Sequence, residues 1–152
     1  MIKLTPEFPS VVPDRDRKFN WYLDEPFQID LEFSNGDKHT IKVDKGYRFN
    51  AHSVPFPFDL VFDKASGPDL YCALVHDVLI DFEMVSRLDR ATMDGVYRDM
   101  MGIEKYQTSK FRSYWMPLGV SLSGYLKHTF WGDHRGDRKK KTVIKIIIKE
   151  NE

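Results

Sequence analysis

The sequence predicts an α+β fold in which a small antiparallel sheet with a hairpin packs against about three helices. Residues 27–43 alternate apolar and polar side chains around an Asn-Gly pair, which is typical of a β-hairpin. Three later stretches repeat large apolar residues every three or four positions, which is typical of helices on a core. The 152 residues are expected to form a single domain with a core at 27–131.

The segment 1–26 is expected to be an extended N-terminal arm laid over the domain. Proline removes a backbone donor and restricts the residue before it, so a proline-rich segment stays extended. A short strand is expected around Phe19–Leu23. The prolines of the arm are Pro6, Pro9, Pro13 and Pro26.

The hairpin is expected to pair Phe27–Phe33 with His39–Val43. Apolar residues occupy every second position of the first segment, and Ile41 and Val43 lie on one face of the second. Asn35-Gly36 between them predicts a type I′ turn, because both residue types tolerate positive φ.

The first helix is expected to open at Pro68 and Asp69 and to run to about Phe82. Its large apolar residues cover a wide arc, which predicts a central helix. The polar residues His76 and Asp77 fall in the remaining arc, about 100° apart around the axis.

Two more helices are expected after it. Ser86 is a suitable N-cap for the second, which ends near Gly102. The third covers about Ser109–Phe130, and Pro117 is expected to kink or split it. The predicted buried stripe of the second helix is Met93, Tyr97 and Met100. The apolar repeat of the third is Phe111, Trp115, Leu118, Leu122, Tyr125 and Leu126.

The tail, 132–152, carries the β-branched segment Thr142–Lys149, which predicts a strand at a sheet edge. Two interpretations are open. The strand either completes the domain's own sheet beside the hairpin or adds to another chain. In the second case the partner-binding residues would be Val143, Ile144, Ile146 and Ile148.

The charge balance and the single cysteine exclude several classes of protein. Basic and acidic residues number 23 each, which argues against nucleic acid as the main partner and allows association between copies. Cys72 has no second cysteine to pair with, so a disulfide framework is excluded and a reducing compartment is expected. No apolar run is long enough for a membrane span, and the first residues lack a signal-peptide pattern.

Three segments share their order and spacing with a known family. They are Gly46-Tyr47-x-x-Asn50-x-x-Ser53-Val54-Pro55, Ala73-Leu74-Val75-His76-Asp77-x-Leu79 and Arg90-x-x-x-Asp94-x-x-Tyr97-x-x-x-Met101. Over about residues 43–126 the chain resembles the phage and prophage family called domain of unknown function 1353. The resemblance implies a phage or prophage origin and no particular reaction. Asn50 stands where the family usually has Asp, and Ala51, His52 and Ile80 also depart from its pattern.

The polar residues of these segments are expected to form a structural cluster. In this interpretation His76 and Asp77 hydrogen-bond the Asn50–Ser53 loop, because buried polar groups need partners. The cluster would contain Asn50, Ser53, His76, Asp77, Arg90 and Asp94. Arg90 and Asp94 lie four residues apart, on one helix face.

A catalytic interpretation uses the same side chains. His76 would act with Asp77, Asp94 or Ser53 in a hydrolase, with a metal held by His76, Asp94 and His52 as a further option. Adjacent helical residues rarely bind one metal, and Ser53 precedes a Val-Pro pair that favours a cap or turn over a nucleophile. No cofactor is expected, and Cys72 is expected to be a small core residue.

The sequence and the resemblance together predict a phage-encoded structural or accessory protein, in the tail or neck machinery of a virion. Its partners would be other phage structural proteins or further copies of itself, and its location the virion, or the host cytoplasm before assembly. One alternative is the hydrolase described above. Another is a binding protein for host takeover or for blocking host defence.

Overall fold

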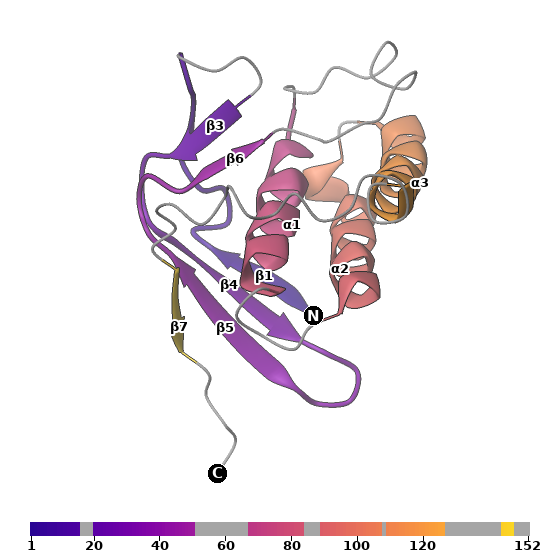
Figure 1. Cartoon of the computed structure of the whole chain (residues 1–152), viewed down its shortest axis with the longest axis horizontal. Coiled ribbons are helices and arrows are strands. Elements are labelled where there is room, and N and C mark those ends of the chain that lie inside the picture. The colour runs from indigo at the N-terminus through magenta and orange to yellow at the C-terminus, as the bar shows by residue number, and fades with distance from the viewer. Residues whose placement is uncertain (16–19, 51–66, 84–88, 108, 127–143, 148–152) are drawn as a thin grey trace. The chain divides into compact units, whose positions relative to one another are not determined.

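A computed structural model of the chain describes residues 1–15, 20–50, 67–83, 89–107, 109–126 and 144–147. It divides into two compact units, one formed by residues 1–49 and 143–152 and the other by residues 50–142. The first unit holds the strands and the second the helices, which confirms the α+β prediction (Figure 1).

The first unit contains a four-stranded antiparallel sheet with the strand order β1-β4-β5-β7 (Figure 1). Its strands are β1 (Ile2–Thr5), β4 (Phe27–Glu32), β5 (Lys38–Val43) and β7 (Ile144–Ile147). Burial alternates along β4: every second residue from Phe27 is buried, and the residues between them are half-buried. This period of two matches the apolar–polar alternation from which the strand was predicted.

The hairpin of β4 and β5 is confirmed, with Phe27 opposite Val43 and Glu32 opposite Lys38. Its turn differs from the expected type I′. The Phe33 carbonyl accepts the Gly36 N–H at 3.0 Å, and the Phe33 N–H donates to the Asp37 carbonyl at 2.9 Å. Ser34, Asn35 and Gly36 therefore form a three-residue loop. Gly36 supplies its positive φ of 90°, as such loops require.

A second sheet in the same unit has the order β2-β3-β6. Its strands are β2 (Val11–Pro13), β3 (Asn20–Leu23) and β6 (Arg48–Asn50). The short strand expected near Leu23 is therefore present. Residues 1–26 were expected to form an arm laid over the domain. They instead supply β1, β2 and β3, whose backbone groups pair within the two sheets.

The tail strand β7 pairs antiparallel with β5, with Ile144 opposite Val43 and Ile147 opposite Thr40. Of the two interpretations left open, the structure has the strand in the chain's own sheet. Ile144 and Ile146 belong to this strand. Val143 and Ile148, the other two predicted partner-binding residues, lie outside the described residues.

The second unit contains α1 (Leu70–Glu83), α2 (Arg90–Gly102) and α3 (Lys110–Leu126), with a short 3-10 helix, η2, at Glu104–Tyr106. Helix α2 contacts both α1 and α3. Its predicted buried residues are confirmed, since Met93, Tyr97 and Met100 are all at most 1% exposed. None of the helices in the described part of the chain is long and apolar enough to cross a membrane.

The N-cap of α2 is Asp89 rather than Ser86. The Asp89 carboxylate accepts the Thr92 N–H at 2.7 Å, and its backbone is extended, as an N-cap requires. Serine and aspartate are both favoured N-cap residues, so the sequence alone does not decide between Ser86 and Asp89. Ser86 itself lies outside the described residues.

Helix α3 runs unbroken from Lys110 to Leu126 with Pro117 inside it, so the proline does not split the helix. The apolar repeat expected to face the core is instead exposed where the structure describes it: Phe111 is 58%, Trp115 41% and Leu118 52% exposed. The buried side of α3 carries Arg112, Met116 and Val120.

Candidate functional site

The polar residues of the family-like segments lie on α1 and α2 of the second unit. His76 and Asp77 sit in the middle of α1, among the buried residues Ala73, Leu74, Val75, Val78 and Leu79. A helix with apolar residues over most of its surface is buried on most sides. His76 is accordingly only 6% exposed and needs a hydrogen-bond partner within the protein.

His76 finds that partner on α2. Its Nε2 lies 2.8 Å from Oδ1 of Asp94, and the two side chains are 8% and 12% exposed. Arg90, one turn earlier on α2, donates from Nε to the same oxygen at 2.9 Å. The imidazole also lies against the ring of Tyr97, with centroids 5.0 Å apart. The contact between His76 and Asp94 therefore fastens α1 to α2.

The protonation state of this contact follows from the surroundings of Asp94. Burial raises the pKa of its carboxyl group, but the hydrogen bond from His76 and the charge of Arg90 outweigh burial, and the pKa lies below the usual value. An ionised carboxylate only accepts hydrogen bonds, so Nε2 of His76 carries a proton. When the ring is neutral, Nδ1 is its acceptor nitrogen.

Asp77 makes a separate contact. Its Oδ2 accepts the backbone N–H of Asn50 at 2.9 Å. Asn50 ends β6 and is the first residue of the second unit. Asp77 thus holds Asn50, as the structural interpretation expected, whereas Nε2 of His76, which was expected to bond the same loop, meets Asp94 instead.

The structure brings some members of the predicted cluster together, in two separate contacts. His76, Arg90 and Asp94 come together, and Asp77 meets Asn50. Ser53 and His52, the candidate nucleophile and the candidate third metal ligand, lie outside the described residues. Among the residues that the structure does describe, no group of three or more His, Cys, Asp or Glu side chains is placed to hold a metal ion.

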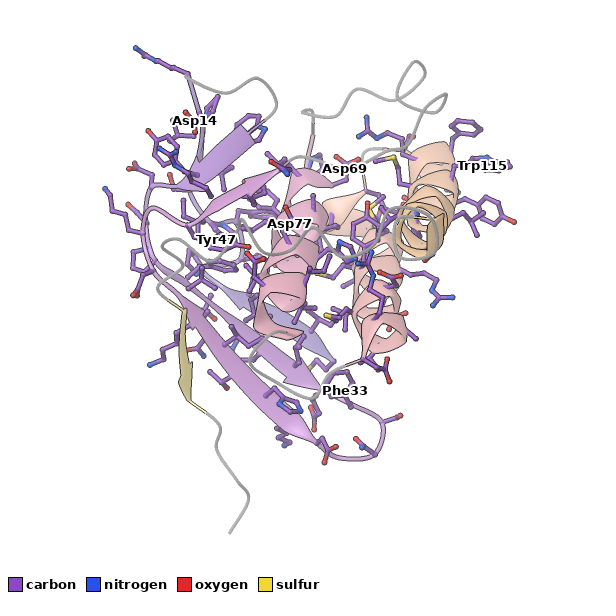
Figure 2. All side chains as sticks on the ribbon, viewed as in Figure 1. Asp14, Phe33, Tyr47, Asp69, Asp77 and Trp115 are labelled. Atoms are coloured by element: carbon purple, nitrogen blue, oxygen red, sulfur yellow. The ribbon has the colours of Figure 1, made fainter. Side chains whose placement is uncertain are left out.

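A second polar contact of α1 was not predicted from the sequence. Oδ2 of Asp69 lies 2.7 Å from Nε of Arg112 on α3, and the two side chains are 0% and 10% exposed. The Asp69 carbonyl also accepts the N–H groups of Cys72 and Ala73, so the residue opens α1 (Figure 2). One indication of this contact was present in the sequence, where Arg112 directly follows Phe111 of the apolar repeat in α3.

Two titratable groups near this ion pair are held in their neutral forms. Burial, reinforced by the negative charge of Asp69, raises the pKa of the Cys72 thiol far above its usual value. Burial also raises the pKa of Tyr97, and the negative charge of Asp69 adds to that increase. A protonated thiol is a poor nucleophile, so Cys72 is a core residue, as expected.

Comparison with known proteins identifies one family. The family model described as "Protein of unknown function (DUF1353)" matches residues 21–120. The match begins earlier than the predicted 43, so it includes the β4–β5 hairpin as well as α1 and α2, and it ends within α3. No curated protein and no solved structure matches the chain.

Proposed function

The chain belongs to the DUF1353 family, and on that premise we propose that it is a phage-encoded structural or accessory protein that works by binding other proteins. We expect it in the virion, in the tail or neck assembly, or in the host cytoplasm before assembly. The family description assigns no reaction, and the chain's own polar residues favour binding over catalysis.

One observation carries the proposal: the candidate polar residues of the family-like segments that the structure describes are engaged within the chain. Nε2 of the buried His76 is occupied by Asp94, and Asp94 is shared with Arg90. Asp77 holds the backbone of Asn50. A general base has to reach a substrate proton, directly or through one water. These side chains instead join elements of the second unit, which supports a structural role for them.

Two further properties favour protein contacts. Helix α3 exposes several large apolar side chains, which are typical of interface centres. The formal charge of zero gives no long-range repulsion between neighbouring copies or subunits.

Quantitative mass spectrometry of purified, salt-washed virions tests the proposal. We expect the chain at a fixed copy number relative to the major structural proteins, and particles from a deletion strain should show an assembly defect. An early, non-structural protein of the same phage is the control for contamination. Absence of the chain from virions would contradict the proposal, and a co-purifying host protein would then favour a host-takeover or defence-blocking binder.

A hydrolase is the second candidate, and one observation favours it. An imidazole held by a carboxylate at 2.8 Å is the arrangement that orients a catalytic histidine. Because Nε2 faces Asp94, Nδ1 would have to act as the base towards Ser53, a metal-bound water or a substrate. The test compares His76→Ala and Ser53→Ala on a panel of esters. Activity lost in both variants with unchanged melting temperatures would support the enzyme and overturn the structural interpretation.

A further inference from the structure

The outward side of α3 carries four large, exposed side chains, which we call the α3 stripe: Phe111, Tyr114, Trp115 and Leu118. They are 58%, 66%, 41% and 52% exposed, respectively. Steps of three and four residues put them on one side of the helix. Trp115 projects outward from α3 in Figure 2. In the described part of the chain, the other large hydrophobic residues with comparable exposure are Met1 and Phe8, both in the first unit.

The opposite side of α3 attaches the helix to its own unit through Met116, Val120 and the Asp69–Arg112 ion pair, all of which are buried. Three side chains of the stripe also contact one another. The ring of Trp115 lies 6.2 Å from that of Phe111 and 5.5 Å from that of Tyr114, between centroids. Such contacts restrict the rotamers before binding, which lowers the entropy lost on binding.

We propose that the α3 stripe is a self-association surface, on which α3 of a second copy of this chain packs. None of its four side chains carries a charge, so an identical stripe complements it chemically. The formal net charge of zero removes the general repulsion that would oppose pairing of like chains. The inference does not rest on the proposed place in a virion.

The spacing of the residues in the stripe is suited to packing against another helix. Phe111, Trp115 and Leu118 follow steps of four and three, the seam of a two-helix packing, and Leu122 and Tyr125 continue these steps in the sequence. In an antiparallel pair centred between Trp115 and Leu118, the large indole of one copy faces the smaller Leu118 of the other. Alternation of large and small side chains is what lets two such surfaces interdigitate.

The size of the stripe sets the strength of the pairing. From typical side-chain areas, the four residues expose on the order of 400 Å². Two copies would bury roughly 800 Å², below the about 1,200 Å² of a standard stable interface. The dimer is therefore weak and concentration-dependent in free solution, and several such contacts in one assembly would reinforce each other.

This inference is tested by sedimentation equilibrium of the full chain over a wide concentration range. The unmodified chain is compared with two variants whose stripes carry opposite charges. One variant carries Trp115→Lys with Leu118→Lys, and the other Trp115→Glu with Leu118→Glu. Each should associate at least about tenfold more weakly than the unmodified chain, because like charges then face each other. An equimolar mixture of the two should recover association, because opposite charges then meet. Phe8→Ser, which removes an exposed aromatic residue of the first unit, is the matched control and should leave association unchanged.

The outcomes separate the possible occupants of the stripe. A chain that stays monomeric at millimolar concentration would overturn the inference and assign the stripe to another segment of the chain or to an unlike partner. Dimers that persist in both charged variants would place the interface elsewhere and also overturn it. The neutral variant Trp115→Gln with Leu118→Gln covers the case in which a charged variant fails to fold. It should melt like the unmodified chain and still associate more weakly.

Discussion

Two polar contacts fasten α1 to its neighbours in the second unit, and they differ in kind. At the start of the helix, Asp69 and Arg112 form an ion pair between side chains that are 0% and 10% exposed. In the middle, His76 meets Asp94, and a partly exposed Arg90 supports the carboxylate. The first contact joins a carboxylate and a guanidinium that are both buried, whereas the second joins an imidazole to a carboxylate that also contacts the partly exposed Arg90. Loss of one partner should therefore cost more in the first contact than in the second.

The largest effect is expected from Arg112→Met. The substitution leaves the Asp69 carboxylate in the core without its counter-charge, which typically costs about 3–5 kcal/mol of unfolding free energy. Urea denaturation followed by circular dichroism measures it. Lys45→Met is the matched control, because Lys45 and Asp24 form an exposed pair and its loss should cost under about 1 kcal/mol.

The double variant Asp69→Asn with Arg112→Met sharpens this prediction. Asparagine removes the charge and still suits the start of a helix. The double variant should therefore recover most of the stability that Arg112→Met loses. If Arg112→Met is no more destabilising than Lys45→Met, the Asp69–Arg112 contact is not the buried ion pair described above.

A smaller loss is expected from His76→Ala. It removes the hydrogen bond to Asp94 and the ring contact with Tyr97, for a cost of about 1–3 kcal/mol. Thermal melting at neutral pH measures this. His76→Gln, which retains a side-chain donor, should recover part of the loss. An unchanged melting temperature in His76→Ala would contradict the structural role of His76, on which the proposed function depends.

Asp77→Ala should have a smaller effect still. The Asn50 N–H loses its acceptor at a half-buried position, where a hydrogen bond contributes about 0.5–1.5 kcal/mol. Asp77→Asn keeps an acceptor oxygen and should be closer to the unmodified chain. The sharper measurement is hydrogen exchange at the Asn50 amide, which should be faster in Asp77→Ala than in Asp77→Asn. Equal exchange rates in the two variants would show that Asp77 does not hold this amide.

The last prediction concerns acid, and its effect is expected to be the smallest. The pKa of Asp94 is lowered in the folded chain, so the unfolded chain binds more protons around the usual carboxyl pKa. The stabilisation is complete above that pKa of about 4 and is lost as the pH falls through the lower, folded value. Asp94→Asn should therefore lose less stability than the unmodified chain between pH 5 and pH 2, each measured against its own neutral value. An equally steep loss would contradict the lowered pKa.

The sequence by itself determined the elements of this protein that depend on neighbours along the chain. Alternation in residues 27–43 is enough to predict the hairpin, and helical spacing predicts α1, α2 and α3. Half of the candidate site was predictable for the same reason, since Arg90 and Asp94 lie one helical turn apart. His76 could be predicted to need a partner, because a polar ring on a mostly apolar helix has to be hydrogen-bonded.

Only the tertiary structure decided which surfaces meet. Period 3.6 shows that one side of α3 is apolar, but burial depends on what packs there. The exposed Trp115 and the buried Arg112 reverse the expectation from the sequence. The Asp69–Arg112 pair joins residues far apart in the chain, so no local pattern could reveal it. The type of the turn at Gly36 and the position of the cap at Asp89 were predicted wrongly, because several turn types and several capping residues satisfy the same local rules.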